Sequence, residues 1–357
     1  MIQIDSNAPA GLRDAVEFVI ANETDWDRDC NSEKWGIYRQ DPPPWNRLLG
    51  PVSSRGPCSG VILQQGRQLA SWGEPDREDL TFSIAKTYLA LLAGVAHDRG
   101  LLPDVDEPVG ARVRGIGFEG LQNGKVTWAH LLQQTSEWEG SCFDVSEQVD
   151  RYRKVSYDPT PAAGVKGEAR PLQPPGEFWE YNDVRINQLS LALLHLFGKP
   201  LPEVFAEAIA GPCGASSDWR WVGYDNSWIE LNGHRVQSVP GGTHWGGGMS
   251  IDSFDQAKIA QMLLDGGRVG DRQVVSADWI RRMHTPCALA QFYGYLVWLN
   301  IGQRVFPGVP ESSWFAIGAG SSINWIEPET RSVVVLRWID ANKAAGVIER
   351  IWRVLGR

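Results

Sequence analysis

Apolar positions follow helical spacing in some segments of the chain and two-residue alternation in others. Residues 11–23 carry apolar side chains every three or four positions, which predicts an amphipathic helix. Residues 59–73, SGVILQQGRQLASWG, alternate and turn at Gln65-Gly66, which predicts a β-hairpin. Residues 79–100, DLTFSIAKTYLALLAGVAHDRG, are apolar on nearly every side after the first turn. They predict a buried helix, so the first hundred residues read as helix, hairpin and helix, with the proline run at 41–45 as an extended connector.

The middle third predicts helices and loops without good strands. Residues 126–136, VTWAHLLQQTS, are amphipathic, and residues 182–198, NDVRINQLSLALLHLFG, predict a long apolar helix that ends at Gly198. Residues 161–181 are rich in Gly and Pro and predict a loop. This third therefore predicts a mainly helical unit.

The last part of the chain returns to strands. A helix at 253–267 follows the glycine cluster HWGGGMS, and another begins at Ser276, which can serve as its N-cap. Residues 292–300, 314–328 and 331–340 predict strands, and residues 342–356 predict a final helix. We therefore expect an α+β fold with one antiparallel sheet built from both ends of the chain. The expected organisation is an N-terminal helix and connector over 1–50, a sheet domain over 51–110 plus 230–357, and a helical insertion over 111–229.

Composition narrows the possible partners. The chain has 357 residues, 43% hydrophobic and 22% charged, which is typical of a globular protein that needs no disulfide or metal for its core. A net charge of −9 without a basic run argues against nucleic acid and membrane surfaces, and no stretch reaches the length of a membrane span. The N-terminus shows no secretion leader, and five scattered cysteines fit reduced thiols. We expect a cytoplasmic protein with no metal or cofactor; a secreted chain that lost its leader is the alternative.

The segment FSIAK places a hydroxyl and an amine on one face of a helix. Ser83 and Lys86 are three residues apart, so their side chains can meet. A lysine that burial keeps neutral can take the serine proton, and a helix N-terminus stabilises a nearby oxyanion. The alternative is that Ser83 caps the helix while Lys86 reaches solvent.

The segment EYND, at the start of the long apolar helix, supplies a second candidate group. Tyr181 beside an amine could relay a proton between Ser83 and a leaving group. Asn182 and Asp183 follow it as short polar side chains. A tyrosine that merely packs its ring is the alternative.

Together these motifs resemble the serine β-lactamase and penicillin-binding-protein superfamily. The features that carry the resemblance are the Ser-x-x-Lys at a helix start, the Tyr-x-Asn-like triplet, the segment LLQQTSEWEG, the segment WGGGMSIDSFDQAKIAQMLLDGG, and a Gly-rich strand that runs into WIEPE. The resemblance extends from about Ser59 to the C-terminus. It is strongest to the class C β-lactamase-like branch, which includes D,D-peptidases, carboxylesterases and 6-aminohexanoate-dimer hydrolase.

The resemblance implies roles for individual residues. Ser83 would be the acylated nucleophile, Lys86 its proton acceptor and Tyr181 the general base and acid. Asp183 stands where the family usually has Asn, and an ionised carboxylate there would keep Lys86 protonated and leave more of the proton transfer to Tyr181. The backbone N–H groups of Ser83 and Ala319 would form the oxyanion hole.

The third family motif, Lys-Thr-Gly or His-Thr-Gly, is only partly present. Ala316-Ile317-Gly318 occupies its place, so Gly318 can let substrate lie along the strand, but the cation is missing at Ala316. A β-lactam or D-alanyl carboxylate would then lack its partner. Other candidate supporting residues are His244, which could lend a donor to the site but which we expect to hold its loop, and four tryptophans that could either line an acyl pocket or pack in the core: Trp138, Trp179, Trp245 and Trp314.

The sequence therefore predicts a serine hydrolase that cleaves a small-molecule amide or ester and is not primarily a β-lactamase. Two alternatives stay open. The chain could be a binding or sensor protein that kept the fold without turnover, as the changes at Asp183 and Ala316 permit. It could also be a D-aminopeptidase or a residual β-lactamase. The oligomeric state is not predicted.

Overall fold

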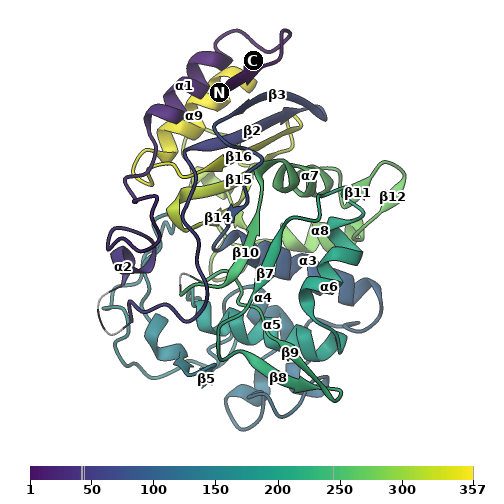
Figure 1. Cartoon of the computed structure of the whole chain (residues 1–357). Helices are drawn as coiled ribbons and strands as arrows, with labels where there is room; N and C mark the ends of the chain where they lie inside the picture. The colour runs from purple at the N-terminus through teal and green to yellow at the C-terminus, as the bar shows by residue number, and fades with distance from the viewer. Residues whose placement is uncertain (42, 44, 244, 357) are drawn as a thin grey trace.

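An antiparallel sheet with flanking helices organises the computed structural model, which describes residues 1–41, 43, 45–243 and 245–356. The main sheet of the described residues has seven strands in the order β1-β3-β2-β16-β15-β14-β13, and all neighbours are antiparallel (Figure 1). The strands are β1 Ile2–Ile4, β2 Ser59–Gln64, β3 Arg67–Trp72, β13 Trp298–Leu299, β14 Trp314–Gly318, β15 Ser322–Glu327 and β16 Ser332–Arg337. The expected α+β fold, with a sheet from both ends of the chain, is confirmed.

Strand β16 lies in the middle of this sheet and joins its two halves. It pairs with β15 on one side and with β2 on the other, and all six of its residues are buried. Because neighbouring strand residues point to opposite faces, both faces must be covered. The helices α1 (Leu12–Ala21) and α9 (Ala344–Leu355) pack together on one side, and α7 (Ser253–Leu264) and α3 (Ile84–Asp98) pack on the strands from the other (Figure 1).

The segments between α3 and β10 form the part of the molecule below the sheet in Figure 1. They include α4 Trp128–Leu132, the 3-10 turn η3 Glu147–Asp150, α5 Asp183–Phe197 and α6 Leu201–Phe205. Short strands also occur there: β5 Ser141–Cys142 pairs with β6 Val145–Ser146, and β8 Trp228–Leu231 pairs with β9 His234–Gln237. The described strands of residues 126–215, where good strands were not expected, are β5 and β6 with two residues each. The proposed division into domains stays a prediction.

A second, three-stranded sheet brings distant segments to the site. It has the order β4-β10-β7, with β4 Asp79–Leu80, β10 Gly248–Ile251 and β7 Arg220–Val222. The remaining elements are α2 Ile37–Gln40, the pair β11 Arg268–Val269 and β12 Arg272–Gln273, and α8 Ala277–Met283. None of the described helices combines the length and apolar character that crossing a bilayer requires.

Several predicted boundaries are confirmed, and two are corrected. The hairpin turn at Gln65-Gly66, the end of α5 before Gly198 and the Ser276 cap of α8 all occur as expected. The helix expected from residue 79 begins only at Ile84, because Asp79 and Leu80 pair with β10 instead. The single strand expected over 314–328 is two strands, since the chain reverses at Gly320 and Ser321, where φ is 70° and 52°.

Candidate active site

Ser83 stands at the residue just before α3, with its hydroxyl turned away from the helix. The preceding Phe82 has a φ of 48°, a left-handed conformation that is strained for a residue with a side chain. Two tryptophans hold this ring edge to face, Trp26 at 5.9 Å and Trp338 at 6.3 Å between ring centroids. Ser83 Oγ donates to the carbonyl of Gly242 at 2.9 Å and makes no capping bond to α3. The helix-cap alternative for Ser83 is therefore wrong.

Lys86 is buried beneath Ser83 and is surrounded by acceptors. Its Nζ lies 2.8 Å from Ser83 Oγ, 3.3 Å from the Gly242 carbonyl and 2.7 Å from Asp183 Oδ1. An ammonium has three N–H donors and a neutral amine only two, so three acceptors fit the charged form. Lys86 thus neither reaches solvent nor has the surroundings of a neutral base.

Asp183 is the residue that accounts for this charge, and it begins α5. Its carboxylate contacts Lys86 through one oxygen and Arg153 Nη1 through the other. Burial alone would lower the pKa of Arg153, but Asp183 and Asp150 raise it above its usual value. Asn182 precedes Asp183 as the N-cap of α5, and its side chain accepts from the backbone of Val184 and Arg185. Asn182 therefore supports the site through the backbone of α5.

Tyr181 lies with its ring between two cations. Lys86 Nζ is 5.0 Å and Arg153 Cζ 5.5 Å from the ring centroid, and the ring stacks on Trp298 at 5.7 Å. Within the described residues, the Tyr181 hydroxyl makes no hydrogen bond to Ser83 or Lys86. The expected neighbourhood of Tyr181 and the amine is present, but as a contact with the ring face.

The end of β14 approaches the start of α3 closely. A Cβ on Gly318 would lie 2.1 Å from the Thr81 carbonyl oxygen and 3.3 Å from the Ser83 nitrogen, so only glycine fits. A Cβ on Gly242 would likewise lie 2.2 Å from the carbonyl of Phe82. Residues two apart on a strand face the same side, so Ala316 faces the layer of α3 like Gly318, and it is buried. Ala319 follows Gly318 at the cavity wall.

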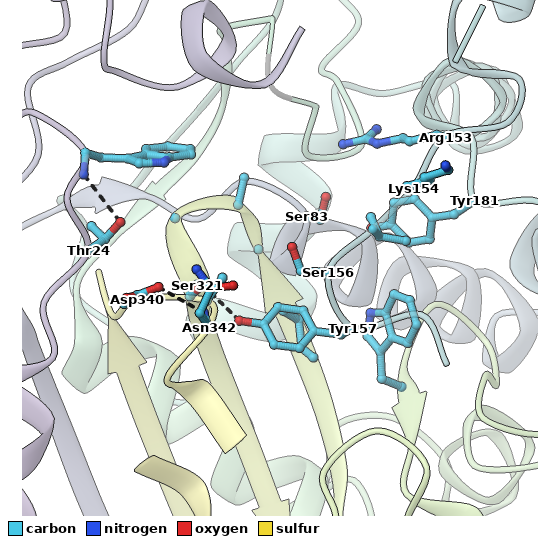
Figure 2. Close-up of a pocket in the computed structure, with 18 of the residues that line it drawn as sticks. Thr24, Ser83, Arg153, Lys154, Ser156, Tyr157, Tyr181, Ser321, Asp340 and Asn342 are labelled. Carbon is cyan, nitrogen blue, oxygen red and sulfur yellow. Dashed lines mark hydrogen bonds between the residues drawn. The ribbon is translucent and has the colours of Figure 1, made fainter. Parts of the chain in front are cut away.

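A cavity of about 400 Å³ opens in front of Ser83. The core of the fold supplies Ser83, Tyr181, Trp298 and residues 317–321 to its wall. Figure 2 shows Ser83, Ser156 and Tyr181 around the same space, with Thr24 and Asp340 on its other side. The chain before β2 therefore closes the cavity with residues 24–26 and Asp41, a contribution that the sequence did not predict.

The N-terminal wall is fixed to the sheet by backbone and side-chain contacts. Thr24 N donates to the carbonyl of Trp338 at 2.9 Å, and the backbone of Glu23 forms an isolated antiparallel β-bridge with Ile339. Arg55 Nη1 reaches Glu23 at 2.6 Å. Trp26 is buried against Phe82 and also lines the cavity. This segment is thus held in place directly beside the residue that precedes Ser83.

Alternating charges lead from Lys86 to this N-terminal segment. We call them the site chain: Asp41, Lys166, Asp150, Arg153, Asp183 and Lys86. Arg153 Nη1 lies 3.1 Å from Asp150 Oδ2, and Lys166 Nζ lies 3.2 Å from Asp150 Oδ1 and contacts Asp41. The backbone N–H of Asp183 also donates to Asp150 at 2.8 Å. Three cations and three carboxylates therefore balance one another from the cavity wall to the base of Ser83.

A second buried ion cluster lies beside the site chain. We call it the support cluster: Glu137, Glu147, Glu180, Arg151, Arg170 and Arg185. Arg170 forms two hydrogen bonds of 2.7 Å with Glu137, and Arg185 reaches Glu137 at 2.8 Å and Glu147 at 3.0 Å. Burial raises the pKa of Glu180 despite its two arginine neighbours; burial would also raise that of Glu137, but Arg170 and Arg185 lower it.

Some of the predicted site residues lie elsewhere. Trp138 and Trp314 are buried in the core, Trp179 packs against it, and none of the three lines the cavity, whereas Trp26 and Trp298 do. Trp245 lines a separate cavity of about 330 Å³ with Trp45 and donates to the Trp45 carbonyl. Core packing, one of the two roles expected for these four tryptophans, therefore accounts for Trp138, Trp179 and Trp314, because large apolar residues near a motif often fill the core. His244 lies outside the described residues.

The functional residues that sequence reasoning missed come from segments without periodicity. Arg153, Ser156, Tyr157 and Lys166 lie in the loop after η3, and residues 24–26 lie in the loop after α1. No pattern in these segments signalled the contacts, because loops carry no periodic spacing of side chains. All five cysteines are free, and a cytoplasmic location stays a prediction. Among the described residues, no group of three or more His, Cys, Asp and Glu side chains is placed to hold a metal ion.

Comparisons with known proteins bear on the family and the fold. Residues 80–338 match the family model described as Beta-lactamase. A family VIII carboxylesterase is similar over 99% of this chain and 100% of its own, with a TM-score of 0.63 at 16% identity. A D-stereospecific amidohydrolase from Streptomyces sp. is similar over 82% of this chain and 92% of its own, with a TM-score of 0.54 at 18% identity.

A penicillin-binding protein from Bacillus halodurans is also similar, over 82% of this chain and 94% of its own, with a TM-score of 0.56 at 18% identity. A comparison with curated protein sequences finds no match. At these identities the solved structures show a shared fold.

Proposed function

Because the chain belongs to the beta-lactamase family, we propose that it is a serine hydrolase that cleaves an amide or an ester through an acyl-enzyme on Ser83. One observation carries the proposal: Lys86 Nζ lies 2.8 Å from Ser83 Oγ at the wall of a cavity large enough for a small molecule. A hydroxyl that an ammonium contacts from below and that faces a cavity is placed to attack a bound carbonyl.

The proposed reaction has two halves that balance. Ser83 Oγ forms a bond to the substrate carbonyl carbon, and the bond to the leaving nitrogen or oxygen breaks. Tyr181 takes the Ser83 proton while its own hydroxyl proton passes to the leaving atom. Water then attacks the acyl carbon, the bond to Oγ breaks, and one water proton returns to Ser83 through Tyr181. The Tyr181 hydroxyl approaches Ser83 once substrate is bound, since such contacts tighten in the substrate complex.

Lys86 and the oxyanion hole would stabilise charge in this reaction. With Asp183 at 2.7 Å, Lys86 acts as an ammonium that favours the developing Ser83 alkoxide instead of taking its proton. The backbone N–H groups of Ser83 and Ala319 would receive the substrate oxygen as it becomes negative. Tyr181 therefore carries the proton transfer in the proposed mechanism.

The substrate we propose is a small amide or ester without a carboxylate that needs the Lys-Thr-Gly cation. Ala316 is buried in that place, and the cavity is partly aromatic, with Trp26, Tyr157 and Trp298 in its wall. Aromatic walls suit an apolar acyl or leaving group. The names of the similar structures include both a carboxylesterase and an amidohydrolase, which supports either bond type on this fold.

Labelling with a fluorophosphonate and a panel of activated esters and amides tests the proposal. Intact-protein mass should show one added acyl or phosphonyl group, and peptide mapping should place it on Ser83. The Ser83→Ala variant should lose labelling and at least about a thousandfold in kcat. Ser156→Ala is the matched control, because this second serine lines the same cavity and should retain labelling. Labelling that survives in Ser83→Ala would overturn the assignment.

Binding without turnover is the second candidate, and the three acceptors around Lys86 favour it. It predicts that esters and amides raise the melting temperature while no product and no covalent adduct form. Hydrolysis of nitrocefin at a useful rate would instead favour a residual β-lactamase.

A further inference from the structure

We propose that Asp41, Lys166 and Asp150 are positioning residues of the reaction, through which the N-terminal segment controls the charge state of Lys86 and Tyr181. The inference rests on the proposed function, because it concerns the proton transfer from Ser83. Asp41 precedes the family match at 80–338, so this control would be a property of the whole chain and not of the matched segment.

The geometry of the site chain carries the inference. Each member contacts the next through a charged group, and Lys86, Asp183 and Asp150 are fully buried. Arg153 and Lys166 keep 10% and 18% of their side chains exposed, at the cavity wall. No step of the chain passes through bulk water, so its charges are weakly screened.

Arg153 is the link between the two ends. The same nitrogen, Nη1, contacts Asp183 on the side of Lys86 and Asp150 on the side of Lys166. Its guanidinium also lies 5.5 Å from the centre of the Tyr181 ring. A change in the charge of Asp150 or Lys166 therefore alters the position of the cation that Asp183 and Tyr181 share.

The sign of each effect follows from charge alone. A nearby positive charge opposes protonation. Loss of the positive charge of Lys166 therefore makes protonation of both Lys86 and Tyr181 more favourable. Loss of the negative charge of Asp41 has the opposite effect. The two ends of the same contact should thus shift the activity profile in opposite directions, which a merely structural role would not do.

Other titratable groups near Lys86 and Tyr181 do not change in this comparison. Burial raises the pKa of Tyr293 and of Tyr224, so both phenols stay neutral at working pH. Lys154 and Asp340 also line the cavity, at its solvent side, where water screens them. All four are identical in every variant below.

The test is the pH dependence of kcat/KM for an ester that the labelling panel identifies. Because Lys86 and Tyr181 both carry their protons at the start of the proposed reaction, their pKa values set the alkaline limb: in Lys166→Met it should move up by about 0.3 to 1 pH unit, and in Asp41→Asn it should move down by a similar amount. Lys166→Arg, which keeps the charge, should restore the wild-type limb and remains informative where Lys166→Met fails to fold. Lys199→Met removes a lysine charge on the surface and should leave the limb in place.

The outcomes separate this inference from the proposed function. The inference alone is overturned if the wild type labels on Ser83 and the pH profile of kcat/KM does not move in the variants. A profile that moves in the same direction in Lys166→Met and Asp41→Asn has the same consequence. A wild-type protein that neither labels on Ser83 nor turns over any ester or amide overturns the proposed function and this inference with it.

Discussion

The site chain and the support cluster share two segments of the chain yet differ in where their charges end. Residues 147–153 and 180–185 alternate between them: Glu147, Arg151, Glu180 and Arg185 belong to the support cluster, whereas Asp150, Arg153 and Asp183 belong to the site chain. Both contain three cations and three carboxylates. The site chain reaches the cavity, while no described member of the support cluster lines it.

This difference shows how one stretch of backbone serves two purposes. In the support cluster Arg170 and Arg185 each contact two or more glutamates and Arg151 contacts Glu147, so the charges satisfy one another in a closed group. In the site chain the charges follow one another in a line, and the cation at one end, Lys86, contacts Ser83. We therefore expect changes in the support cluster to affect stability and changes in the site chain to affect the pH profile of activity.

The largest expected effect is on stability, in Arg185→Met. Arg185 is buried between Glu137, Glu147 and Glu180, so its loss leaves three buried carboxylates with fewer partners. Breaking a buried ion group in this way costs about 3 to 5 kcal/mol. Urea unfolding measures the loss, and kcat per folded molecule should stay near the wild-type value.

Arg331→Met is the control for this variant. Arg331 pairs with Asp265 with 54% of its side chain exposed, and such surface pairs contribute about 0 to 1 kcal/mol. An Arg185→Met protein as stable as Arg331→Met would contradict the role assigned to the support cluster.

The second effect is on activity, in Asp183→Asn, which introduces the residue usual for the family at this position. Lys86 and Arg153 lose the carboxylate between them, so a proton on Lys86 or Tyr181 is opposed by more positive charge. The alkaline limb of kcat/KM should move down by about 1 to 2 pH units. A pH profile measured on the folded fraction tests this, and an unmoved limb would separate Asp183 from the chemistry.

The smallest effect distinguishes two carboxylates within the support cluster. The pKa of Glu137 is lowered below 4.5, so its ionisation stabilises the fold above that pH, and this stability is lost as the pH falls through the folded pKa. The pKa of Glu180 is raised above 4.5, so its stabilisation is complete below that pH and is lost as the pH rises through the folded pKa.

Glu137→Gln should therefore become less stable relative to wild type as the pH rises from 4 to 7, and Glu180→Gln should become more stable relative to it. Unfolding free energies of the three proteins across this range provide the measurement. Parallel trends in the two variants would show that the carboxylates titrate alike.

Much of the fold follows from the sequence, because long periodic segments carry their own signal. The hairpin at 59–73 and the helix ending at Gly198 occur where alternation and the glycine place them. Strands of two residues, such as β4 and β13, have no period to detect. The reversal at Gly320 and Ser321 was missed because apolar residues on both sides of it read as one strand.

The candidate site likewise has a part that could be predicted from the sequence and a part that could not. Ser83, Lys86, Tyr181 and Gly318 were predicted from motifs, and the structure brings them together. Arg153 and Lys166 were not, because charged residues in a loop rich in Gly and Pro read as solvent-exposed, and only the fold shows that they are enclosed. The N-terminal wall was missed for a related reason, since a connector has no pattern that points to a cavity.

The pairing of β16 with β2 limits how the gene can be shortened. A protein cut to residues 80–338, where the family match begins and ends, would lose β1, β2, β3 and α9. Strand β16 would then expose six buried residues along an open edge, and open edges pair with other molecules. Insoluble material from such a fragment would report the broken sheet, so screening libraries for new substrates should begin from the full chain.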